Sequence, residues 1–215
     1  GAGKTTLLLQ ILEKLTERGY KTAYASGEEC IEMLSVTCKR IGVKNVFIAN
    51  ETDIDALVKC TKDVDILIVD SFFSLTSNIR SSREHEKHCI QELCKAGKKN
   101  GCAIGVVLHI SKSGQYKGGT IIPHTVDTVI HLHREMLDGQ PDDYVKCCVT
   151  KNRFGPTCEM SLLMTSNGYD WDYIPTPSVP DGQPRVSRRD QEMDTLLKNT
   201  KLTLKQAAGK LKSVQ

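Results

Sequence analysis

The chain has 215 residues, of which 39% are apolar and 26% are charged. This balance is ordinary for a folded, soluble protein and excludes collagen-like and fully disordered classes. The length allows one domain, or one domain with an appendage, around a substantial core. The net charge of +3 is too small to indicate a nucleic-acid partner by itself. No apolar run approaches the ~20 residues of a membrane span, so we expect a soluble cytoplasmic protein.

Cysteine is frequent, with nine residues, but no Cys-x-x-Cys pair occurs. The spacing therefore does not match that of metal ligands. Cys89, Cys94, Cys102 and Cys147 lie inside apolar patterns, where a thiol behaves as a small hydrophobic group. The odd count fits a reducing compartment, and we expect all nine to be structural or incidental.

Helical and strand patterns alternate over the first half of the chain. The predicted elements are a glycine-rich loop leading into a helix that closes at Gly19, strands at 21–26, 45–50, 65–71 and 102–110, and helices at 27–42, 53–63 and 84–101. The strand at 65–71 is a continuous apolar run, which is typical of a parallel strand covered on both faces. The pattern predicts a doubly wound, mostly parallel α/β sheet with helices on both faces.

Three further strand-like runs, at 127–135, 143–154 and 159–165, are expected to continue the sheet as an antiparallel meander. The composition then changes, and we divide the chain into an α/β core at 1–174, a Pro-rich linker at 175–189 and a basic helical tail at 190–215. The tail has two short amphipathic patterns. These fit either the first two helices of a helix-turn-helix or a frayed basic end.

The opening sequence GAGKTT matches the end of the phosphate-binding motif G-x-x-x-x-G-K-[ST]. Gly3, Lys4 and Thr5 occupy its last three positions, with Gly1 and Thr6 on either side. The first glycine of the motif would precede Gly1, so we expect a longer chain. In such a loop, backbone N–H groups face the phosphates of ATP, the lysine bridges the β and γ groups, and the threonine hydroxyl ligates Mg²⁺. A glycine-rich turn with a chance Lys-Thr pair also fits, but the amphipathic helix that follows favours the nucleotide site.

Polar residues at the ends of three predicted strands complete this site. Asp70 closes the strand at 65–71 and could reach Mg²⁺ through water. Glu28 follows the strand at 21–26 and could deprotonate the attacking water, whereas Glu29 is expected to be an exposed acid in the first turn of the next helix. His109 ends the strand at 102–110 and could sense the γ-phosphate, although a buried structural histidine fits almost as well.

Two polar segments are candidates for DNA contact. The loop after His109 is rich in glycine and lysine, so that Lys112 and Lys117 could bind phosphates while Tyr116 stacks on a base. An ordinary flexible loop has the same composition. Arg80 and Arg83 belong to a second segment of this kind.

Two cations stand two positions apart in KNRFGPT, after a run that alternates like a strand. Lys151 and Arg153 would therefore project from one face of the strand. Their common target is either a surface carboxylate or a phosphate.

Taken together, the motifs YASGEE, DILIVDS, LHISKSGQYKGG, HTVDTVIHLH and above all KNRFGPT resemble bacterial RadA, a RecA-like ATPase of recombination and repair. The resemblance extends from Gly1 to about Trp171. It is a divergent one, because neither the four-cysteine zinc module nor the Lon-protease-like domain that usually accompanies this core is found in these residues.

The resemblance implies a RecA-like core that assembles into a homo-oligomeric ring, of six subunits in the usual case, with ATP at the subunit interfaces and DNA bound by the ring. By the same analogy, Glu28 is the catalytic acid and the loops after Asp70 and His109 contact DNA. Lys151 and Arg153 would reach the nucleotide of a neighbouring subunit, or the DNA, because the triphosphate concentrates negative charge.

The leading hypothesis is thus a Mg²⁺-dependent, DNA-stimulated ATPase motor acting on single-stranded or branched DNA. A replicative-helicase-like motor could use the same core, but the Lys151 and Arg153 signature argues against it. A third hypothesis is an ATP-gated regulator whose tail reads duplex DNA.

Overall fold

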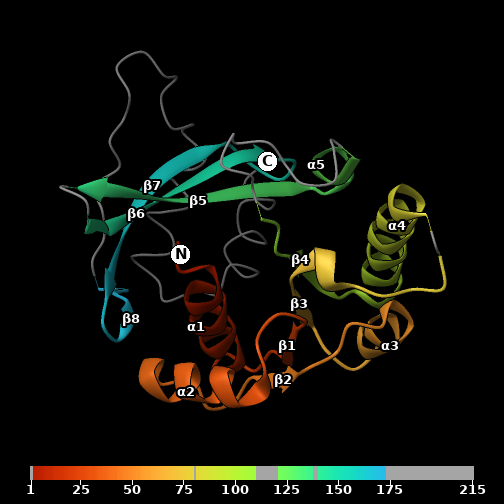
Figure 1. Ribbon diagram of the computed structural model, residues 1–215, viewed down its shortest axis with the longest axis horizontal. Helices are drawn as coiled ribbons and strands as arrows, with labels where there is room; N and C mark the ends of the chain where they lie inside the picture. Colours follow the sequence, from red (N-terminus) through yellow and green to blue (C-terminus); the bar gives the residue numbers. More distant parts are fainter. Residues whose placement is uncertain (1, 80, 110–120, 138–139, 173–215) are drawn as a thin grey trace, which may run out of the picture. The chain divides into compact units, whose positions relative to one another are not determined.

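Four parallel strands form the central sheet, in the order β2-β1-β3-β4. The computed structural model describes residues 2–79, 81–109, 121–137 and 140–172, without the side chains of 135–142 (Figure 1). All of these belong to one unit spanning Gly1–Pro177. The strands are β1 (Thr22–Ser26), β2 (Phe47–Ala49), β3 (Ile66–Asp70) and β4 (Ala103–Val106).

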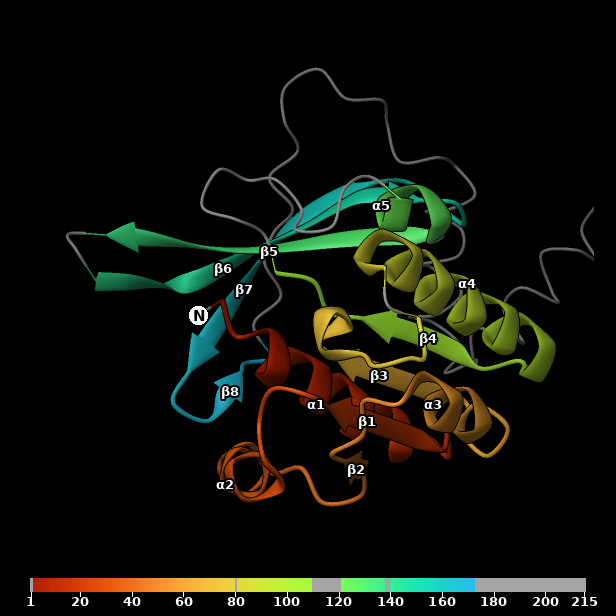
Figure 2. The same cartoon turned by 45° about the vertical axis from the view of Figure 1, so that its right-hand side comes forward.

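Helices cover both faces of this sheet (Figure 2). They are α1 (Lys4–Thr16), α2 (Ile31–Ile41), α3 (Ile54–Cys60) and α4 (Ser82–Asn100), with a short 3₁₀ turn, η1 (Phe72–Ser74), after β3. Because successive strand side chains point to opposite faces, Ala23 and Ala25 pack with α3 and α4, whereas Tyr24 packs with α1 and α2. The predicted doubly wound α/β fold is confirmed.

Glycines end two of these helices as the sequence indicates. Gly42 and Gly101 adopt φ values of 76° and 70° at the ends of α2 and α4. A left-handed residue lets the following chain bond back to the last turn, as the N–H of Val43 does to the carbonyl of Cys38.

The antiparallel strands form a second sheet, in the order β5-β6-β7-β8, so the prediction that they continue the first sheet is wrong. They are β5 (Thr128–Leu137), β6 (Gln140–Asn152), β7 (Cys158–Thr165) and β8 (Gly168–Tyr169). Within the described ranges, no ladder joins the two sheets. The physical reason is α5 (Ile121–Thr125), which forms where a loop was expected and buries Ile122 among the α3 and α4 side chains. Strand β5 therefore starts away from the edge of β4.

The second sheet packs on α1 instead. Leu7 of α1, Val145 of β6 and Tyr169 of β8 form a separate buried cluster. Helix α1, which begins with Lys4 and Thr5 of the predicted phosphate loop, thus contacts both sheets.

All nine cysteines carry free thiols. Cys89, Cys102 and Cys147 are buried, and burial raises the pKa of Cys89 and of Cys102 to about 11. These thiols stay protonated at neutral pH and pack as small apolar groups. Among the described residues, every helix is too short or too polar to cross a bilayer.

Candidate nucleotide-binding site

A pocket of about 320 Å³ opens at the carboxyl ends of β1 and β3, beside the start of α1. It gathers most of the predicted nucleotide residues, although they come from distant parts of the sequence. Its lining comprises Ala2, Gly3, Lys4, Thr5, Thr6, Ser26, Glu28, Glu29, Thr37, Arg40, Asp70 and His109. Ligands of α/β proteins commonly bind at this edge of a parallel sheet.

The phosphate loop enters α1 through Gly3, whose φ of 71° is left-handed. The N–H groups of the first helical turn have no partner within the helix and can bind an anion. A Cβ at Gly3 would lie 2.8 Å from the Tyr169 hydroxyl and 2.9 Å from Cε of Met164. Both the backbone angle and the space therefore require glycine at this position.

Asp70 ends β3 next to Ser26 of β1, and its side chain is buried. Thr5 Oγ1 donates a hydrogen bond of 3.1 Å to Asp70 Oδ2, and the Tyr24 hydroxyl donates to the same oxygen. Burial, followed by this bond to Asp70, raises the pKa of Tyr24 and keeps its hydroxyl protonated as a donor. The two predicted Mg²⁺ ligands are thus in direct contact, and a hydroxyl and a carboxylate are oxygen donors of the kind that Mg²⁺ prefers.

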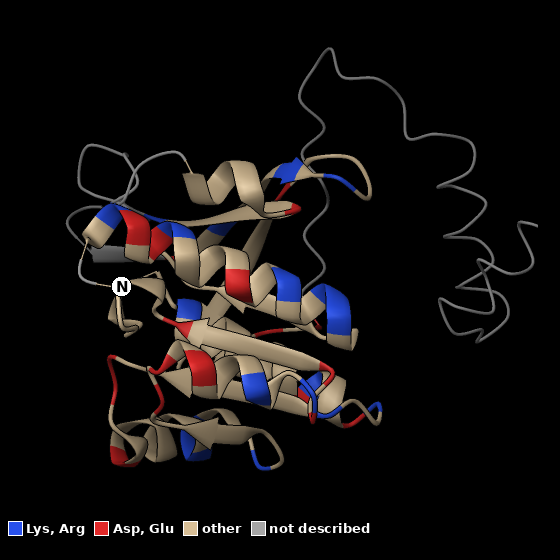
Figure 3. Cartoon of the chain, turned by 90° about the vertical axis from the view of Figure 1, so that its right-hand side faces the viewer, with Lys and Arg blue, Asp and Glu red and all other residues tan. Residues whose placement is uncertain are grey.

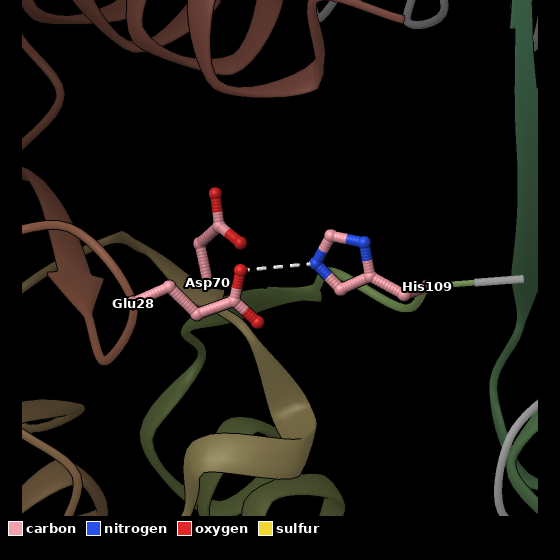
Figure 4. Close-up of side chains that lie close together, drawn as sticks. All are labelled: Glu28, Asp70 and His109. Atoms are coloured by element: carbon pink, nitrogen blue, oxygen red, sulfur yellow. Dashed lines mark hydrogen bonds and ion pairs between the residues drawn. The ribbon is translucent and has the colours of Figure 1, made fainter. Parts of the chain in front are cut away.

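Glu28 lies two residues beyond β1, with its carboxylate beside that of Asp70, and is half exposed (Figure 4). Ser71 Oγ donates a hydrogen bond to Oε1 of Glu28, and His109 Nε2 lies 3.1 Å from Oε2. The Ser71 bond, followed by the nearby His109, lowers the pKa of Glu28. One ligand atom each from Glu28, Asp70 and His109 lie within 4.8 Å of one another. This geometry could hold a cation, or a water next to a base.

His109 reaches the pocket from beyond the strand, because β4 ends at Val106. The N–H of Val107 still bonds to Val69, and the carbonyl of Val107 accepts from the N–H of Phe72. The chain then leaves the sheet and carries the imidazole to Glu28.

Sequence reasoning missed several residues of the site. In the sequence, Ser71 is only the last residue of a predicted strand, and Tyr24 is only one residue of another. Thr37 and Arg40 come from α2, where a polar residue gives no signal that it faces a pocket. Alternation along β1 could have placed Tyr24 on the α1 face, but only the register with β3 shows that its hydroxyl meets Asp70.

Lys151 lies outside this pocket and binds its own chain. Its Nζ donates to the carbonyl oxygens of Pro123, His124 and Val126, at 2.8, 3.2 and 2.7 Å. These carbonyls lie at and just beyond the C-terminal end of α5, where helix carbonyls lack partners within the helix. A cation is favoured there.

Arg153 binds the connection that follows α5. Its guanidinium donates a hydrogen bond of 2.8 Å to Asp127 Oδ1. The backbone N–H of Arg153 donates a second one, of 3.1 Å, to the carbonyl oxygen of Asp127. Both signature cations therefore contact the segment between α5 and β5.

Of the predicted DNA contacts, Arg83 is exposed in the first turn of α4, a helix that carries charges of both signs (Figure 3). Arg80, Lys112, Tyr116 and Lys117 lie outside the described residues. So do Gly1, the linker and the tail.

No family model matches the chain. Curated relatives do. It is 33% identical over 171 residues to the DNA repair protein RadA of Chlamydia muridarum, 30% over 182 residues to that of Brucella abortus and 31% over 171 residues to that of Bacillus subtilis. These alignments cover 76% to 78% of the chain. The chain spans 36% to 38% of the length of these relatives.

Solved structures show the same architecture. A DnaB-like replicative helicase, solved in a study of its interactions with primase, matches 79% of the chain with a TM-score of 0.67 at 13% identity, and 54% of that protein is covered. A solved ATPase domain matches equally well, with 80% of it covered. At this identity the likeness shows the fold, which is RecA-like. With the curated relatives, it makes the chain a divergent RadA-like protein built on a RecA-like ATPase fold.

Proposed function

We propose that the chain is the catalytic core of a Mg²⁺-dependent ATPase motor that acts on single-stranded or branched DNA in recombination and repair. The observation that carries this proposal is the contact of Thr5 with Asp70, from β3, together with the carboxylate of Glu28, which lies beside Asp70 in the same pocket. A chance Gly-Lys-Thr turn would not be expected to have a buried acid and a second carboxylate so placed.

Each residue has a distinct task in this proposal. The first-turn N–H groups of α1 and the Lys4 ammonium bind the β- and γ-phosphates. Thr5 and Asp70 would hold Mg²⁺, which when bound neutralises phosphate charge. Tyr24 fixes Asp70 through its buried hydroxyl and so orients the carboxylate.

Glu28 is the proposed base. Its lowered pKa keeps the carboxylate ionised at neutral pH, so that it can accept a proton from the attacking water. Ser71 and His109 each engage one carboxylate oxygen and thereby orient the group. His109 also lies at the pocket, where its Nε2 could respond to the γ-phosphate.

We propose a DNA substrate because the relatives are DNA repair proteins. We propose a ring with ATP at subunit interfaces because the fold is that of a DnaB-like helicase. In such a ring, Lys151 and Arg153 could approach a neighbour's nucleotide or DNA. To do so, Lys151 would have to give up its hydrogen bonds to three carbonyl oxygens, and Arg153 its bond to Asp127. A role in fixing the α5–β5 connection needs no such release.

The test measures ATP hydrolysis with Mg²⁺, alone and with single-stranded, branched and duplex DNA, on a chain that carries a complete phosphate loop. Glu28→Gln should bind ATP but lose at least 100-fold in kcat, in line with the usual contribution of a general base. Glu17→Gln, an exposed acid at the end of α1, is the matched control and should hydrolyse normally.

Stimulation by single-stranded or branched DNA would support the motor. Separation of the DNA strands in the presence of ATP would show helicase activity in addition. A rate of ATP hydrolysis that does not change when DNA is added, together with sequence-specific duplex binding, would instead favour the ATP-gated regulator. Normal hydrolysis in Glu28→Gln would refute the assignment of the base.

A further inference from the structure

The last residue of the second sheet touches the phosphate loop. Tyr169 ends β8 and is 4% exposed. Its hydroxyl donates a hydrogen bond of 3.0 Å to the carbonyl oxygen of Ala2. It also fills the space above Gly3 that a Cβ would need. This side chain thus contacts two consecutive residues at the point where the chain turns into α1.

The backbone that carries Tyr169 is fixed to α1. The N–H of Tyr169 donates to Gln10 Oε1 at 2.8 Å, and Gln10 Nε2 donates to the carbonyl of Tyr169 at 3.3 Å. The ring packs with Leu7 and Met164. Helix and strand therefore hold the tyrosine from two sides, which leaves its hydroxyl little freedom to move away from Ala2.

The same hairpin is also tied to α2. Arg40, which lines the pocket, donates from its guanidinium to the carbonyl of Ser166 at 2.7 Å, in the turn between β7 and β8. The hairpin formed by β7 and β8 therefore contacts the phosphate loop, α1 and α2, three of the elements that surround the pocket.

We propose that Tyr169 is a positioning residue for nucleotide binding: its hydroxyl holds Ala2 so that the N–H groups at the start of α1 face the phosphates before ATP arrives. The inference rests on the proposed function and deepens it. Groups that are already oriented bind a ligand more tightly, because binding then costs no free energy to order them.

The hydroxyl, rather than the ring alone, carries this role. Burial raises the pKa of Tyr169 to about 12, so the hydroxyl is protonated and can donate at any physiological pH. The ring already has its apolar partners in the cluster with α1. Replacing tyrosine with phenylalanine keeps these contacts and removes only the bond to Ala2.

The experiment compares Tyr169→Phe with the unsubstituted protein by titrating a fluorescent ATP analogue in the presence of Mg²⁺, and by steady-state hydrolysis. Tyr20→Phe is the matched control, because Tyr20 is 49% exposed and follows the far end of α1. We expect Tyr169→Phe to raise Kd and KM about 3- to 10-fold, the usual worth of one hydrogen bond. We expect kcat at saturating ATP to change little, and the melting temperature to fall by about 1–6 °C, as for the loss of one hydrogen bond.

Three outcomes separate the possibilities. Equal Kd values for Tyr169→Phe and the unsubstituted protein overturn the positioning role, while the proposed ATPase function stands. A higher Kd that returns to the value of the unsubstituted protein once only the folded fraction is counted overturns it too, since the loss would then be one of folding. If the unsubstituted protein binds no nucleotide, the proposed function itself fails. Gln10→Met, which frees the backbone of β8 but keeps Tyr169, should weaken binding in the same direction and gives an independent check.

Discussion

Replacing Lys151 by methionine should destabilise the core even without nucleotide or DNA. Methionine keeps most of the apolar stem but removes the ammonium that bonds to three carbonyls around the C-terminus of α5. Those oxygens would then depend on water. A lysine that served only a neighbouring subunit would leave the stability of the isolated chain unchanged.

The magnitude follows from the burial of these contacts. The bonds to Pro123 and Val126 are partly buried and the one to His124 is exposed. A partly buried hydrogen bond to a charged group contributes about 1.5 kcal/mol or more, and a cation at a helix C-terminus adds about 0.3–1 kcal/mol. Because a single ammonium makes all three bonds, their contributions do not add, and we expect a loss of about 2 kcal/mol in the free energy of unfolding. For a domain of this size, that lowers the melting temperature by about 4–8 °C.

Urea unfolding followed by circular dichroism measures this loss directly. Lys62→Met provides the control, because Lys62 is an exposed lysine in the turn after α3. A free energy of unfolding for Lys151→Met within about 0.5 kcal/mol of the control, the range usual for surface substitutions, would contradict this expectation. In that case the three bonds contribute nothing net, and a role for Lys151 between subunits becomes the better explanation.

Three further predictions concern the site and its support. Ser71→Ala removes the largest cause of the lowered pKa of Glu28; because the base acts when deprotonated, the acidic limb of the kcat profile should move to higher pH, and an unmoved limb would contradict this. Asp70→Asn should raise the Mg²⁺ concentration needed for half-maximal hydrolysis about 10-fold or more, as measured by Mg²⁺ titration; an unchanged requirement would remove Asp70 from the ion. Glu13→Ala should lower the free energy of unfolding by about 3 kcal/mol, because the buried carboxylate accepts from the backbone of Lys44 and from two N–H groups of Asn45; urea unfolding against Glu17→Ala checks it.

The parallel part of the fold could be predicted because each element leaves a periodic signal in its own segment. The continuous apolar run before Asp70 and the helix after Lys4 are examples. The meeting of Thr5 and Asp70 also followed, because the ends of parallel strands share one edge of the sheet with the loop that precedes α1.

The remainder depends on contacts that no local pattern encodes. Helix α5 is short, and its place is fixed by the burial of Ile122 and by Lys151, which lies 25 or more residues later. The contact of Tyr169 with Ala2 joins the two ends of the core. From the sequence alone, Tyr169 is only one aromatic residue after a turn. The sequence leaves a carboxylate or a phosphate open as the target of KNRFGPT, and only the structure shows Arg153 on the carboxylate of Asp127 and Lys151 on backbone carbonyls.

Strand β6 contributes to both of these long-range contacts. Val145, in its middle, belongs to the cluster with α1 and Tyr169, and Lys151, near its end, binds the carbonyls around the end of α5. Between these two residues the pairing of β6 with β5 shifts by one position, since Val129 pairs with Lys151 and Ile130 with Val149, so Thr150 forms a bulge that bends the strand. One strand of the second sheet therefore contacts both α1, through Val145, and the segment that enters β5, through Lys151, and the bend at Thr150 lets it reach the two on either side.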